Sequence, residues 1–444
     1  MTQAYVDQEA TFVNRTSKGE ARETAVVESP VTQRYFELDA LRVIAFGVLI
    51  FYHIGMYYVL EWGWHIKSDV QFPLLQDVMI LTNQWRMSLL FLISAMVFTV
   101  VLRRAYGQTT SRWRVSLSLL GKRALRILIP LVFGMFVIVA PQVYAEWTVS
   151  GALAMPFSEF YVAYINPNTD LFIDKQSVIG LLTWNHLWFL PYLFVYSAFI
   201  LLFFPLIRFV EVRALRVLDS LALFSVLVVA IMTAIWLELR AAYPTSHDLL
   251  NDWYSHAKYF FVMLVGIVIV LRPALYAAIM KSRHVSLTIA IALYSVIILD
   301  RHDLLGPTGQ LMESSPGFRV LVGVIVVLNH WAWLAAILGF GRKYLSYPSK
   351  VVSYLNKGVL PYYMVHQTII VVAAFFLSSS VSSTLGEFIL ITLITVVGCA
   401  LTYEVAKRFL ILRFLFGLKL NENYKSEKEK GAMSRHSCHS AFTV

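Results

Sequence analysis

Two ionisable side chains lie eleven residues apart inside one apolar stretch of the sequence. Arg42 and His53 both belong to residues 37–60, ELDALRVIAFGVLIFYHIGMYYVL, which are long enough to cross a bilayer. At ~100° per residue, eleven residues make about three helical turns, so both side chains share one face, ~16 Å apart along the axis. Histidine is suited to accept a proton near neutral pH, and arginine to bind an anion. The spacing predicts the wall of a channel, with an anion at one end and a general base at the other.

Asp39 extends the same face by one turn. We therefore take His53, Arg42 and Asp39 as the candidate catalytic residues. Alternatives stay open for each of them. His53 would also fit as a core histidine satisfied by one hydrogen bond. Arg42 would fit as a side chain that reaches the headgroups, or that pairs with Asp39 at i,i+3.

A second cationic pair, Arg123 and Arg126, opens the membrane helix that we predict over 123–143. At i,i+3 both guanidinium groups project to the same side, and their forks suit phosphate oxygens. A helix N-terminus would add positive potential. We expect Arg123, Arg126 and Arg42 to bind an anionic cofactor or co-substrate. Ordinary anchoring of a basic loop at the membrane surface is the alternative.

Four further residues are candidates for substrate binding. Arg86 opens the predicted second helix, and His186 and Trp188 open the fourth. All three are expected on the outer side of the membrane, in whose half His53 lies. For these three, anchoring at the membrane interface is the alternative. His366 follows Pro361, which removes one helical hydrogen bond, and a structural role suits it equally well. No i,i+4 histidine pair or carboxylate spacing supports a metal site.

Composition places the chain in the membrane. Of its 444 residues 58% are hydrophobic and only 14% are charged, where a soluble domain has about 25%. The net charge of +10 is concentrated in particular loops, so it indicates topology and not nucleic-acid binding. The two cysteines give no disulfide framework. Residues 1–34 lack the apolar core of a cleavable signal peptide.

The predicted fold is all-α, with a membrane domain over 37–418 between disordered cytoplasmic tails, 1–36 and 419–444. Basic and acidic loops alternate along the chain, which places both termini in the cytoplasm. The long link from about 144 to 185 carries aromatic residues that suit either sugar rings or the membrane interface. Ten spanning helices are predicted, over 38–60, 79–102, 123–143, 186–207, 217–239, 256–272, 284–300, 318–340, 358–379 and 386–408.

At these motifs the chain resembles the membrane-bound acyltransferase 3 family. The resemblance covers roughly residues 35–410 and rests on three features: Leu38-Asp39-Ala-Leu-Arg42, Arg42-x10-His53 and Arg123-x-x-Arg126. Trp85-Arg86-Met87 and His186-Leu-Trp-Phe-Leu are similar to the branch of the glucan biosynthesis protein C type, a periplasmic glucan succinyltransferase. Ala95 departs from that branch, which often carries glycine there.

The resemblance implies an inner-membrane, multi-pass O-acyltransferase in the lipid bilayer. It would move an acyl group from cytoplasmic acyl-CoA, either succinyl-CoA or acetyl-CoA, to a hydroxyl of a periplasmic glucan or another extracytoplasmic glycan. Arg123 and Arg126 would hold CoA phosphates, Arg42 would line the path of the pantetheine arm, and His53 would activate the acceptor hydroxyl.

Two other functions stay open at the level of sequence: a transporter or flippase of an acyl or glycan carrier, and a non-catalytic membrane scaffold. The residues do not fix the acyl group, the acceptor or the oligomeric state. They also do not decide between direct transfer and an acyl-His53 intermediate.

Overall fold

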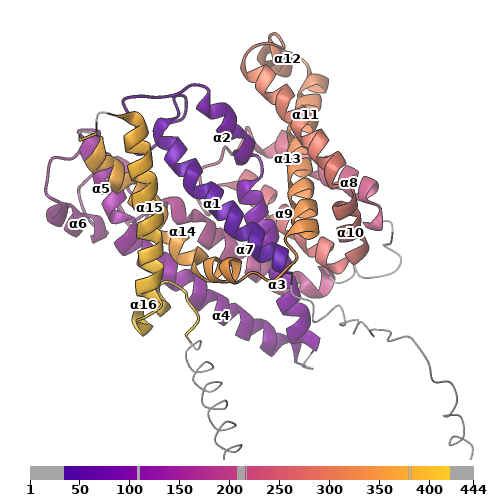
Figure 1. Cartoon of the computed structure of the whole chain (residues 1–444), viewed down its shortest axis with the longest axis horizontal. Helices are drawn as coiled ribbons and strands as arrows, with labels where there is room; N and C mark the ends of the chain where they lie inside the picture. Colours follow the sequence, from indigo (N-terminus) through magenta and orange to yellow (C-terminus); the bar gives the residue numbers. More distant parts are fainter. Residues whose placement is uncertain are drawn as a thin grey trace, which may run out of the picture. The chain divides into compact units, whose positions relative to one another are not determined.

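Helices make up nearly all of the regular structure. The structure is a computed structural model that describes residues 35–107, 111–207, 216, 218–378, 380–381 and 383–420. Within these ranges no β-strand is present, and ten helical stretches are long and apolar enough to cross a membrane (Figure 1). The predicted all-α membrane fold with ten spans is confirmed. The tails predicted over 1–36 and 419–444 lie almost wholly outside the described residues, and so does Cys438.

Several spans consist of more than one helical piece. The spans are α1 (Phe36–Tyr58), α2 (Leu75–Asn83) with α3 (Arg86–Gly107), α4 (Arg112–Phe133) with the π-helix η1 (Gly134–Ile138) and α5 (Ala140–Val149), the 3-10 helix η3 (Asn185–Trp188) with α7 (Phe189–Ile207), α8 (Leu221–Leu239), α9 (Trp253–Leu271), α11 (Arg283–Arg301), α13 (Pro316–Tyr344), α14 (Lys350–Leu377) and α15 (Thr384–Ala406). Shorter elements connect them: α6 (Phe157–Ile165), η2 (Ile173–Lys175), α10 (Pro273–Lys281), α12 (Thr308–Ser314) and α16 (Leu410–Leu415).

The third span begins much earlier than predicted. Its helix α4 starts at Arg112, because the polar stretch 112–122 continues the helix below the apolar run. Arg123 therefore lies eleven residues, or ~16 Å, inside α4. The electrostatic effect of a helix N-terminus fades within the first turn. The prediction that this terminus adds positive potential at Arg123 and Arg126 is therefore wrong.

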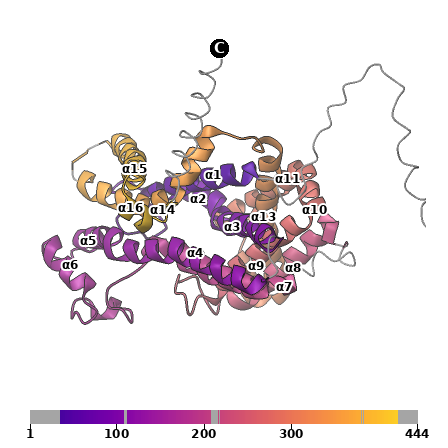
Figure 2. The same cartoon turned by 90° about the horizontal axis from the view of Figure 1, so that it is seen from below.

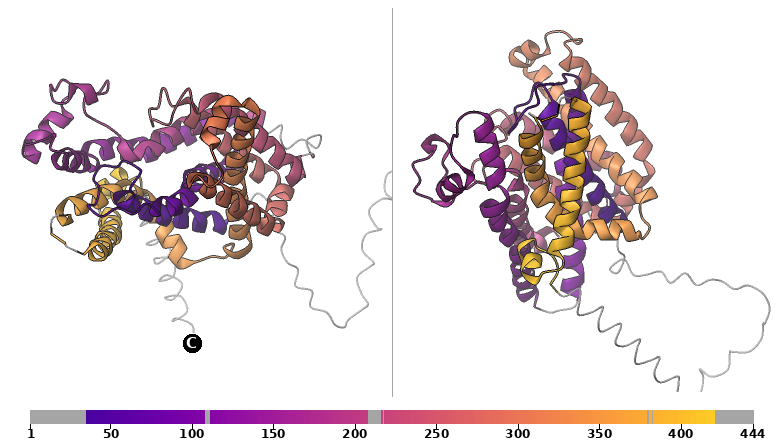
Figure 3. Two further views of the ribbon diagram at one scale, coloured as in Figure 1. Left: turned by 90° about the horizontal axis from the view of Figure 1, so that it is seen from above. Right: turned by 60° about the vertical axis from the view of Figure 1, so that its left-hand side comes forward.

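Helix α1 packs one face against the bundle. It contacts α14, α3 and α13, while α14 packs on α15, α3 on α9, and α4 on α7 (Figures 2 and 3). Leu38, Leu41, Ala45, Phe46 and Leu49 of α1 are buried. In contrast, α11 exposes apolar side chains along much of its length, as a lipid-facing helix does.

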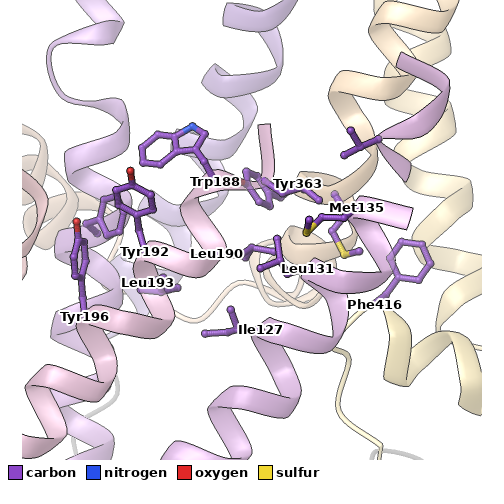
Figure 4. Close-up of a cluster of buried hydrophobic side chains, with 14 of the residues drawn as sticks. Ile127, Leu131, Met135, Trp188, Leu190, Tyr192, Leu193, Tyr196, Tyr363 and Phe416 are labelled. Carbon is purple, nitrogen blue, oxygen red and sulfur yellow. The ribbon is translucent and has the colours of Figure 1, made fainter. Parts of the chain in front are cut away.

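A buried apolar cluster joins α4, α7 and α14. Figure 4 shows Ile127, Leu131 and Met135 from α4 and η1 facing Leu190 of α7 and Tyr363 of α14. The cluster continues into the link between α5 and η3, where Trp147 and Tyr164 are buried against other aromatic rings. These two side chains thus hold the link together, and neither the sugar-stacking nor the interfacial interpretation applies to them.

The turn after α16 brings the chain onto α4 beside the arginine pair. Gly417 has φ +64°, a left-handed conformation. A Cβ at this position would lie 2.6 Å from the backbone oxygen of Arg126. The close approach therefore requires glycine.

We expect Gly417→Ala to lower the midpoint of thermal unfolding in detergent, because it adds a backbone clash to a left-handed strain of about 1–2 kcal/mol. Gly151→Ala is the matched control, since Gly151 has φ +72° and a Cβ added there would meet no atom within 4 Å. Scanning fluorimetry of both variants measures the difference. Equal shifts for the two variants would contradict the clash.

Candidate active site

Three imidazoles gather in one half of the bundle. The ring centroid of His53 in α1 lies 5.2 Å from that of His366 in α14, and the His366 ring lies 5.4 Å from that of His186 in η3. We call the end of the bundle that holds these residues the histidine end. Three elements far apart in sequence thus bring together three of the residues that the sequence predicts.

Both ring nitrogens of His186 have hydrogen-bond partners. Nε2 donates to the backbone oxygen of Met364 at 2.9 Å, so Nδ1 of the neutral ring accepts from Nε2 of Gln142 at 3.2 Å. A carbonyl can only accept, which fixes this tautomer. His186 is buried, and its role is to tie η3 to α14.

The other two histidines each keep a nitrogen without a partner. His366 is fully buried, and its Nδ1 donates to the backbone oxygen of Tyr363 at 2.8 Å. Its Nε2 therefore carries a lone pair in the neutral ring, and this atom has no hydrogen-bond partner. Nδ1 of His53 is buried and unpartnered as well. Since His53 is only half-buried, it is the imidazole that a substrate would reach first.

Arg86 adds an unpaired cation beside these rings. Its side chain is 4% exposed, and Nε and one terminal nitrogen have no hydrogen-bond partner. The guanidinium carbon lies 3.5 Å from the centre of the Tyr52 ring, and the Tyr52 and His53 rings are 5.7 Å apart. Arg86 is also close enough to act electrostatically on His53 and His366. A buried cation without a counter-charge is costly, so this position suits an anionic group of a substrate.

A polar network surrounds the histidine end. Nδ1 of His65 donates to the carboxylate of Glu146, and Nε2 of His65 lies 2.9 Å from Nε2 of Gln367. The Gln367 amide also reaches Oε1 of Gln142 at 3.4 Å and Oδ1 of Asn185 at 3.3 Å. His65, Glu146 and Gln367 are not among the candidates predicted from the sequence. For His65 and Glu146 no spacing signal exists, whereas Gln367 adjoins the candidate His366.

Three arginines converge at the opposite, cationic end. Arg42 donates to Oδ1 of Asn356 at 3.2 Å, and Nδ2 of Asn356 donates to Oδ1 of Asp39 at 2.9 Å. Arg123 is close enough to both Arg126 and Arg42 to interact electrostatically with them. Like charges that converge in this way favour a bound anion. The structure thus groups Asp39 with the arginines predicted to bind an anion, about 21 Å along α1 from His53, and not with the histidines.

Apolar side chains fill the stretch between the two ends. Phe46 and Leu49 lie on the same face of α1 as Arg42 and His53, and both are buried. The ring of Phe46 packs 5.5 Å from that of His366 and 6.3 Å from that of Tyr362. The channel predicted along this face of α1 is therefore filled at Phe46.

Comparison with known proteins decides the family. A family model described as an acyltransferase domain matches residues 35–404, which include both ends of the site. The chain belongs to the acyltransferase 3 family. Comparisons with curated proteins and with solved structures returned no match.

As a member of the acyltransferase 3 family, the chain is a membrane acyltransferase with multiple spans. Of its predicted site residues, the structure gathers His53, His186, His366 and Arg86 at one end. Trp188 belongs to a different cluster: its ring stacks 4.2 Å from that of His247. Burial lowers the pKa of His247, so this stacked ring stays neutral. Trp188 thus packs on a different ring, and its substrate role stays a prediction.

Substitution of His186 should destabilise this acyltransferase more than substitution of His53. His186→Ala removes two hydrogen bonds and a buried ring, and we expect a loss of about 2–4 kcal/mol in the free energy of unfolding. His53→Ala removes a half-buried ring with an unpartnered nitrogen, so we expect a much smaller change. Thermal unfolding of both variants in detergent measures the contrast, and a larger loss for His53→Ala would contradict these assignments.

Proposed function

We propose that this acyltransferase moves a succinyl or acetyl group from cytoplasmic acyl-CoA to a hydroxyl of a periplasmic glucan or another extracytoplasmic polysaccharide, in the inner membrane. One observation carries the proposal. Helices α1 and α4 present converging arginines at one end, and α1 and α14 present imidazoles with unpartnered nitrogens about three turns of α1 away. This arrangement suits a donor and an acceptor that meet from opposite sides of the membrane.

The distribution of charge supports the orientation. The cationic end adjoins the basic residues that end α3 and begin α4, and the positive-inside rule places such residues in the cytoplasm. The histidine end then faces the periplasmic side. This orientation puts the arginines where cytoplasmic acyl-CoA arrives.

The donor would be held by its phosphates and its extended arm. Arg126 is exposed, and Arg123 and Arg42 are half-buried, so the three form a path from solvent into the bundle. Arg123 packs 4.1 Å from the centre of the Phe98 ring and has an unpartnered, buried Nε. Phosphate oxygens suit guanidinium forks. The pantetheine arm would then follow α1, displace Phe46 and bring the thioester to His53.

At the histidine end, a base and a cation would flank the thioester. Nδ1 of His53 takes the proton of the acceptor hydroxyl while the hydroxyl oxygen attacks the thioester carbonyl. The C–S bond breaks, and CoA leaves as a thiol with the proton from His53. His366, whose Nδ1 is fixed by Tyr363, presents Nε2 as a second proton acceptor. Arg86 would stabilise the oxyanion or pair with a succinyl carboxylate.

The pair of His65 and Glu146 would position the acceptor. The Glu146 carboxylate orients the His65 imidazole, and that imidazole in turn contacts Gln367, which follows His366 in α14. In this proposal His65 acts through the network, while His53 touches the reacting atoms.

His53→Ala should lower kcat by about 10²–10⁴, because a positioned general base contributes that factor. The measurement uses membranes with labelled succinyl-CoA or acetyl-CoA and a glucan acceptor. His284→Ala, which changes an exposed histidine of α11, is the matched control. Unchanged turnover in folded His53→Ala protein would refute the catalytic role of His53.

Arg123→Ala combined with Arg126→Ala should raise KM for acyl-CoA with little change in kcat, because these side chains bind parts of the donor that do not react. Arg112→Ala with Arg114→Ala is the control, since both residues are exposed on the first turn of the same helix. A KM for acyl-CoA equal to that of the wild-type protein would contradict phosphate binding by Arg123 and Arg126.

A further inference from the structure

An apolar groove opens beside the histidine end, between α1, α2 and α15. It has a volume of about 600 Å³, and its lining includes Phe51, Tyr52 and Gly55 of α1, Val78 and Met79 of α2, and Phe388 of α15. The proposed reaction uses none of these apolar side chains. The groove is therefore a feature that the catalytic arrangement does not explain.

The groove opens sideways, toward the lipid. Phe51 and Phe388 are exposed, and Val78 is 59% exposed, on helices that span the membrane. Gly55 forms part of the floor, where a Cβ would lie 3.2 Å from Sδ of Met79. Apolar side chains exposed at this depth contact hydrocarbon. The groove thus suits an alkyl or isoprenoid chain.

The groove leads to an unpaired cation. Tyr52 lines it, and the guanidinium carbon of Arg86 lies 3.5 Å from the centre of the Tyr52 ring. Arg86 is 4% exposed and has two nitrogens without a hydrogen-bond partner. His53 follows Tyr52 in α1. The apolar groove, the cation and the base thus all adjoin Tyr52, which suits a lipid chain, an anionic linkage and a hydroxyl-bearing head.

We propose that the acceptor is a glycan joined through phosphate to a long apolar chain. This inference rests on the proposed acyl transfer and adds the form in which the acceptor arrives. The donor is assigned to the cationic end, so the groove at the opposite end serves the acceptor. The chain occupies the groove, the phosphate pairs with Arg86 in place of the oxyanion or a succinyl carboxylate, and a sugar hydroxyl reaches His53. The acceptor therefore enters from the membrane and not from the aqueous phase.

The test compares two acceptors that carry the same sugar. One is a free glucose oligosaccharide, and the other is that oligosaccharide joined by a phosphodiester to an isoprenoid alcohol. Val78→Trp fills the groove from an exposed position, so it leaves the core packing intact. Val226→Trp on α8 is the matched control, since Val226 is 65% exposed and does not line the groove.

We expect Val78→Trp to raise KM for the lipid-linked acceptor about tenfold or more, the effect of losing about two buried methylene groups. KM for the free oligosaccharide should not change, and Val226→Trp should affect neither acceptor. If Val78→Trp leaves both acceptors unchanged, or slows both equally, the groove holds only ordinary bilayer lipid and the inference is overturned.

A second readout does not depend on turnover. An isoprenoid phosphate with a photoreactive group in its chain should label peptides of α1, α2 or α15, and the lipid-linked acceptor should compete with it. Competition by phosphatidylglycerol at the same concentration would overturn the inference. Wild-type protein that acylates only the free oligosaccharide would overturn it while the proposed function stands. Wild-type protein that acylates neither acceptor would contradict the proposed function itself.

Discussion

The parallel pairing of α1 and α14 is the constraint on which the rest of the site depends. Asn356 of α14 lies against Arg42 and Asp39, and ten residues further along the same helix His366 lies against His53. Because both helices rise ~1.5 Å per residue in the same direction, one register fixes both contacts. A slip of α14 by one turn would separate the polar pairs at both ends together. The distance between Arg42 at the cationic end and the imidazoles at the histidine end is thus a property of this helix pair.

At the histidine end, some buried polar groups have hydrogen-bond partners and others do not. In a membrane, polar groups of the interior depend on protein partners. His186 has partners at both nitrogens, and Glu37 accepts from Arg342 at 2.8 Å and from Tyr276 at 3.1 Å. The orphaned nitrogens of His53, His366 and Arg86 lie close together by contrast. Satisfied polar groups thus surround a region with unused hydrogen-bonding capacity, which the proposed function assigns to substrates.

Much of the fold could be read from hydropathy and periodicity. Ten apolar runs gave ten spans, and the 3.6-residue period put Arg42 and His53 on one face. The start of α4 could not be found in this way, because an amphipathic stretch continues a helix where the apolar run has ended. The contact of His65 with Glu146 joins a loop to a helix 81 residues later, and no local pattern encodes it. The hydrogen bonds of His186 to Gln142 and Met364 are also tertiary contacts, whereas the bond of His366 to Tyr363 is local to α14.

The measurement that tests the central claim most directly is the sidedness of the reaction in proteoliposomes with one known orientation. Labelled acyl-CoA is supplied only on the side of the cationic end, and acceptor only on the side of the histidine end. We predict labelled acceptor on the far side and free CoA on the near side, with no intact acyl-CoA crossing. Transfer that requires both substrates on one side, or intact acyl-CoA found across the membrane, would contradict the account.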